Sequence, residues 1–102
     1  MDTDNLIAHG RARFEHAVAR RTLEEKYQAR MTFAHAGGLW RAGPELMTLL
    51  HICKPTVPQV ILDLYNNPVR VVPQELFELA SERWQEQMNA WLVEYEQSNQ
   101  TR

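Results

Sequence analysis

Cysteine is rare in this chain, and this restricts the cellular compartments in which we expect the protein to be found. Cys53 is the only cysteine among the 102 residues, so no disulfide can form within the chain. Small secreted domains usually depend on disulfides, whereas proteins of reducing compartments do not. No apolar run approaches the ~20 residues of a membrane-spanning helix, and the acidic start differs from the basic start of a secretory signal. We therefore expect a soluble, cytoplasmic protein that does not enter a membrane.

Signatures of catalysis and of cofactor binding are missing as well. The glycines follow neither the G-x-G-x-x-G pattern nor the phosphate-binding pattern that ends in Lys-Ser or Lys-Thr. His51 and Cys53 are the closest pair of metal-ligating side chains, but residues two apart on a helix point in different directions. Cys53 also adjoins an apolar stretch, which does not favour a reactive thiolate. We predict no catalytic residue, no metal site and no cofactor, and therefore not an enzyme.

The chain does have enough apolar residues for a core, and its composition changes near the middle. The apolar share is 44%, typical of a globular protein. The run His35–Leu46 holds three of the four glycines. Residues 1–54 carry a net charge of +2 and residues 55–102 a net charge of −4. We predict a single globular domain over residues 1–97 and a frayed C-terminal tail over residues 98–102.

Residues 3–29 are predicted to form a long helix because strong helix formers fill most positions. Apolar residues lie on two faces about half a turn apart, with Ile7, Phe14 and Val18 on one and Leu23, Tyr27 and Met31 on the other. A straight helix packed on one core would not show this pattern. Either the helix bends or breaks near Arg20–Thr22, or its two ends bury different faces, one against its own domain and one against a partner.

The next segment fits two structures. Side chains in residues 30–36 alternate with the two-residue period of a strand, Gly37–Gly38 suit a tight turn, and Leu39–Arg41 would pair back as a small hairpin. In the alternative, the helix continues to Ala36 and Gly37 is its left-handed stop. We favour the hairpin because threonine and phenylalanine prefer strands.

The rest of the chain predicts a short helix and a second hairpin. Pro44 suits a helix start, and the following residues are apolar nearly all round, so we expect a short buried helix that ends at Lys54–Pro55. Two apolar runs flank Asn66–Asn67, which suit a two-residue hairpin turn. One face of this second hairpin is expected to be covered by the rest of the protein. Three alternating side chains lie on that face: Val60, Leu62 and Leu64.

A long amphipathic helix is predicted from Pro73 to Gln97, because its apolar residues recur every three or four positions. Its outer face is acidic and could meet the arginines of the first helix, within one chain or between chains. The fold is thus predicted to be α+β: a long N-terminal helix, a small hairpin, a short buried helix, a second hairpin and a long C-terminal helix.

The apolar faces exceed what one small core uses, so we predict self-association as a homo-oligomer. The residues expected at the interface are aromatic, apolar or basic, and come from both long helices and the central run: Phe14, Val18, Tyr27, Trp40, Arg41, Trp84, Trp91 and Tyr95. Trp40 and Arg41 are interpreted as an exposed recognition tip. The most distant alternative is a small enzyme or ligand binder with a pocket beside these two residues.

Four basic residues of the first helix are candidate nucleic-acid contacts: Arg13, Arg20, Arg21 and Lys26. They scatter around the helix axis, and neighbouring glutamates cancel much of their charge. A solvated or salt-bridged face is therefore the favoured interpretation.

The run from Ala36 to Leu46, the turn Tyr65–Val69 and the helical segment Trp84–Trp91 carry a resemblance that extends over most of the chain. In these segments the chain resembles small accessory and virion proteins of large tailed bacteriophages, without a specific family motif. The resemblance implies an assembly, scaffolding or host-takeover protein in the host cytoplasm or the virion. We predict a non-catalytic protein-interaction or assembly module, with a nucleic-acid-associated accessory protein as the alternative.

Overall fold

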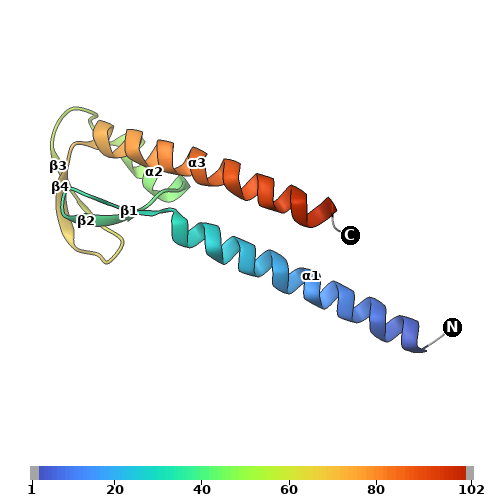
Figure 1. The fold of residues 1–102 in the computed structure, drawn as a ribbon. Coiled ribbons are helices and arrows are strands. Elements are labelled where there is room, and N and C mark those ends of the chain that lie inside the picture. Colours follow the sequence, from blue (N-terminus) through green and yellow to red (C-terminus); the bar gives the residue numbers. More distant parts are fainter. Residues whose placement is uncertain (1–2, 101–102) are drawn as a thin grey trace.

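Two long antiparallel helices extend from a small head of strands and one short helix in the computed structural model (Figure 1). The structure describes residues 3–100, with side chains for residues 7–98. Seven elements follow one another: α1 (Thr3–Arg30), β1 (Thr32–His35), β2 (Gly38–Arg41), α2 (Pro44–Ile52), β3 (Gln59–Leu62), β4 (Pro68–Val71) and α3 (Pro73–Gln100). The predicted α+β fold is confirmed.

The molecule is elongated rather than globular. Its extents are 67 × 24 × 21 Å, and its radius of gyration is 19.4 Å, whereas a compact chain of about 100 residues has a radius of about 13 Å. The helix α3 continues to Gln100, beyond the predicted domain end at residue 97, so residues 98–100 are helical. Residues 101–102 of the predicted tail lie outside the described part of the chain. No helix within that part is long and apolar enough to cross a membrane.

The helix α1 is uninterrupted, and its two ends differ in what they bury. No break occurs at Arg20–Thr22. Tyr27 is 1% exposed beside α3, and Met31 just beyond the helix is fully buried. Phe14, at the other end, is 70% exposed. The predicted break is therefore wrong. The other alternative, in which the two ends bury different faces, agrees with the structure at the end of α1 that packs on its own chain.

The strands β1 and β2 form the first predicted hairpin, but its turn lies one residue earlier than expected. Ala36 and Gly37 occupy the turn with φ of 54° and 82°, and Gly38 pairs with His35 inside the sheet. An added Cβ at Gly38 would lie 3.0 Å from Val69 Cγ2 and 3.1 Å from Trp40 Cζ2. Close packing rather than turn geometry therefore requires this glycine.

The second hairpin, β3 and β4, differs from the prediction in its turn and in its covered face. Five residues, 63–67, connect the strands instead of two, and only Asn66 has a positive φ, 64°. Val60 and Leu62 are 56% and 58% exposed, whereas Ile61 is half-buried and Asp63 is buried. The predicted face was wrong, because hydrogen bonds to Asp63 turn the other side of the strand inward.

The core lies in the head, between α3 and the strands. Its buried members are Met31, Phe33, Trp40, Ala42, Leu50, Val71, Leu76 and Ala80. The helix α2 contributes only Leu50 to this group, and Ile52 at its end is 76% exposed. The expectation of a buried helix was therefore wrong: α2 lies on the surface, with one side against α3 and the other in solvent.

Candidate interaction surface

The two long helices are joined by a cluster of polar and aromatic contacts, the α1–α3 clasp, made by Lys26, Tyr27, Trp91 and Glu94. Lys26 Nζ lies 2.6 Å from Glu94 Oε1, and the Tyr27 hydroxyl donates a hydrogen bond to the same oxygen. The Tyr27 and Trp91 rings stack with centroids 5.8 Å apart and planes at 7°. The ion pair between the first helix and the acidic last helix is thus made within one chain, by a lysine rather than by one of the arginines that the sequence indicated.

Hydrogen bonding shifts two ionisations in the clasp in opposite directions. The Lys26 ammonium and then the Tyr27 hydroxyl, both donating to the Glu94 carboxylate, hold the pKa of Glu94 below its usual range. The hydrogen bond that Tyr27 donates to Glu94, aided by burial, raises the pKa of the tyrosine. The clasp is therefore strongest when Glu94 is ionised and Tyr27 is neutral.

Acid is expected to weaken this clasp. The pKa of Glu94 is lower in the folded protein than the ordinary 4.5, so its contribution is complete above that pH and is lost as the pH falls through the folded value. Thermal melts from pH 6 to pH 3 should show a steeper fall for the natural protein than for Glu94→Gln, by about 3 °C, since the pair is partly solvated. Glu75→Gln, in the first turn of α3, is the control, and parallel curves for Glu94→Gln would contradict the role of the clasp.

Beyond the clasp, α1 continues as the α1 arm, defined as residues 7–22. Figure 1 shows that α1 extends past the C-terminal end of α3. Every side chain of the arm is exposed except that of His16, which is half-buried. Ile7, Phe14 and Val18 are 56%, 70% and 41% exposed. The arm thus carries large apolar side chains without a core to receive them.

No protein-family model matches this chain, and no curated protein or solved structure does. The surface itself must therefore indicate the function. Large exposed apolar groups on one face are typical of contact surfaces. The arm meets this description along one face of a helix, and the head also exposes large apolar side chains, among them Ile52, Leu62 and Tyr65.

The structure distributes the predicted interface residues over three environments. Tyr27 and Trp40 are both 1% exposed and belong to the interior. Trp84 and Trp91 are partly buried, against the core and in the clasp. The exposed members are Phe14, Val18, Arg41 and Tyr95.

The proposed recognition tip is therefore wrong for Trp40. Its indole lies inside the head, and its Nε1 donates a 2.9 Å hydrogen bond to the His35 carbonyl. Arg41 is exposed, because side chains along a strand alternate between the two faces of a sheet. A hollow of about 650 Å³ does lie beside these two residues, bounded also by Gln28 and Glu45.

The four candidate nucleic-acid contacts do not form one basic surface. Lys26 is engaged by Glu94 in the clasp. Arg13 and Arg20 share one side of α1, whereas Arg21 projects about a quarter turn away. All four are exposed, but they point in three directions.

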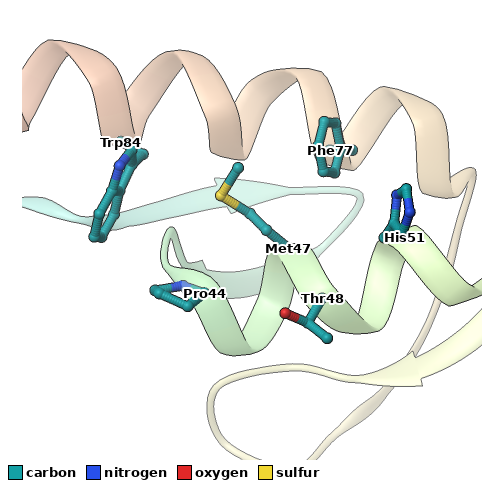
Figure 2. A pocket seen from close by; sticks show the side chains of 6 residues that line it. All are labelled: Pro44, Met47, Thr48, His51, Phe77 and Trp84. Atoms are coloured by element: carbon teal, nitrogen blue, oxygen red, sulfur yellow. The ribbon is translucent and has the colours of Figure 1, made fainter.

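A second hollow, of about 480 Å³, lies between α2 and α3. Figure 2 shows its lining, with side chains from both helices: Pro44, Met47, Thr48, His51, Phe77 and Trp84. The lining is mainly apolar, and His51 and Thr48 are its polar members. Among the described residues, no three His, Cys, Asp or Glu side chains gather closely enough to hold a metal ion.

Two parts of the surface are missing from the predicted interface residues. Ile7 is one of them, although its helical spacing had already placed it on one face with Phe14 and Val18. The roles of Lys26 and Glu94 had no local signal, because the two residues are 68 positions apart. Such a pair follows only from the way in which α1 and α3 pack.

Proposed function

We propose that this protein is a non-catalytic interaction or assembly module that self-associates through the α1 arm, with the adjoining side of α3 as a further contact. The observation that carries the proposal is the exposure of Ile7, Phe14 and Val18 on a helix that leaves its own domain. Apolar surface of this kind gains free energy when it is covered, at about 25 cal/mol per Å².

The C-terminal part of α3, which extends past α2, has a second exposed apolar area. Leu92 and Tyr95 are 54% and 41% exposed, and the partly buried Met88 lies one turn before Leu92. The resemblance to small phage accessory proteins implies assembly rather than catalysis. The single cysteine, Cys53, favours a cytoplasmic setting.

The test is whether association depends on the arm. In sedimentation velocity between about 1 and 200 µM, we expect the apparent mass of the natural chain to rise above the monomer mass as the concentration increases. A small interface of this kind binds weakly, so association should become visible within this range. Phe14→Glu should weaken association at least about tenfold, because it removes a large contact and adds an uncompensated charge. The dissociation constant obtained from the same experiment measures this weakening.

A matched control is available on α3. Val93 is 54% exposed and lies on the side of its helix opposite Trp91, so Val93→Glu adds the same charge away from the proposed contact. This variant should associate like the natural chain. A natural chain that remains monomeric over the whole range would overturn the proposed function.

A further inference from the structure

The exposed face of the arm contains a glycine at its centre. Gly10 follows Ile7 by three positions and precedes Phe14 by four, so all three lie side by side on the helix surface. Nothing within 4 Å of an added Cβ at Gly10 would oppose a larger side chain. Glycine costs about 1 kcal/mol relative to alanine in a helix. No contact within the described chain accounts for it.

The arm also lacks the packing that normally stabilises a helix. Helices in proteins gain most of their stability from the packing of an apolar face. Within the arm only the His16 side chain is half-buried, and the clasp begins outside the arm at Lys26. A partner on the Ile7–Val18 face would supply the missing packing.

We propose that this partner is the same face of a second copy, paired antiparallel about a two-fold axis near residues 12 and 13. This inference rests on the proposed self-association. In that register Ile7 faces Val18 of the second copy, and Phe14 faces Gly10 of the second copy. The flat surface at Gly10 receives the Phe14 ring, and the two-fold axis repeats the contact.

The charges flanking this face select the antiparallel direction. Arg11 and Glu15 are both exposed and project on the same side of the face, one turn apart. An antiparallel pair places Arg11 opposite Glu15 of the second copy, twice. In a parallel two-fold pair, residues on the same flank of the face lie on opposite sides of the contact, so Arg11 and Glu15 of the two copies would not meet.

The rest of the molecule leaves room for the second arm. The face that contacts α3 contains Tyr27, about half a turn around α1 from Ile7 and Phe14. The second helix therefore approaches from the side opposite α3, which leaves the exposed side of α3 for a separate contact, and the two heads lie at opposite ends. Two copies of 67 Å length that overlap along their arms span about 100 Å.

The contact is small. About three helical turns separate Ile7 from Val18, and such an interface falls below the roughly 1,200 Å² of stable complexes. We therefore expect a dissociation constant in the micromolar range.

Two charge reversals test the register directly. Arg11→Glu places two carboxylates opposite each other across the interface, and Glu15→Arg places two guanidinium groups opposite each other. Each variant alone should therefore associate at least about fivefold more weakly than the natural chain. An equimolar mixture should regain association, because both cross pairs are then of opposite charge.

The mixture isolates the contacts between chains. Within each variant chain the two positions carry like charges before and after mixing, so recovery can only come from pairing with the other variant. Sedimentation velocity at a fixed total concentration measures all four samples: the natural chain, each variant alone and the mixture.

Gly10→Ala provides an independent measurement. The added methyl raises helix propensity, so the helical circular dichroism signal should not fall, yet it occupies the space of the Phe14 ring and should weaken association severalfold. Natural-strength association in both charge variants, with no gain on mixing, would overturn the antiparallel arm pairing and leave self-association through another surface intact. A monomeric natural chain would overturn both proposals.

Discussion

Replacing Trp40 with alanine is expected to lower the free energy of unfolding by about 3–5 kcal/mol, the usual cost of removing a buried tryptophan. Trp40 is 1% exposed and is the largest fully buried side chain of the core. Its ring packs against Gly38, and its Nε1 donates a 2.9 Å hydrogen bond to the His35 carbonyl, which joins the two strands of the first hairpin. Urea denaturation followed by circular dichroism measures the loss.

Two further variants separate packing from other effects. Trp40→Phe keeps most of the ring but removes the indole donor, so the His35 carbonyl loses its bond and about 1–2 kcal/mol should be lost. Leu39→Ala alters the neighbouring residue, which is 37% exposed, and should have a small effect. Equal losses for Trp40→Ala and Leu39→Ala would show that the head is not organised around the indole.

The long helices follow from the sequence because periodicity and caps are local signals. The apolar residues of α3 recur at helical spacing, and Pro44 and Pro73 begin α2 and α3 as expected. The strand interpretation of the residues before Gly37 is also correct. In that segment, side-chain alternation and β propensity agreed.

The errors lie where tertiary packing decides between local alternatives. Gly37–Gly38 suits a tight turn, but only the approach of Val69 and Trp40 shows that Gly38 belongs inside the sheet. The apolar character of α2 predicted a buried helix, yet the head is too small to surround it.

The candidate surface was only partly predictable for the same reason. Helical spacing showed that Phe14 and Val18 share a face distinct from that of Tyr27. Whether an aromatic side chain is a contact residue or part of the core depends on distant neighbours. Trp40 looked like a tip beside two glycines and is instead the centre of the core.

Removing the carboxylate of Asp63 is expected to uncouple the two hairpins. Its Oδ2 accepts a 3.1 Å hydrogen bond from the Leu39 amide of β2, and its Oδ1 accepts bonds of 2.9 Å each from the Tyr65 and Asn67 amides. The Leu64 amide adds a 2.8 Å bond to the Leu39 carbonyl. One buried side chain therefore orders the 63–67 loop and ties it to the first hairpin.

Asp63→Ala leaves three backbone donors without this acceptor, so the melting temperature should fall by about 10 °C. These hydrogen bonds, led by the one from the Asn67 amide, hold the pKa of Asp63 below its ordinary 3.8. Its contribution is thus present above that pH and is lost as the pH falls through the folded value. Hydrogen exchange at the Leu39, Tyr65 and Asn67 amides should accelerate at least about tenfold in the variant.

Glu45→Ala, which removes an exposed carboxylate in the first turn of α2, is the control and should leave these amides protected. Asp63→Asn keeps one oxygen acceptor and should fall between the natural chain and Asp63→Ala, with a flatter response to acid. The α1 arm lies at the far end of the molecule from this loop, so its self-association should survive below the melting temperature. An Asp63→Ala variant that melts like the natural chain would show that the Asp63 carboxylate is not needed to join the hairpins.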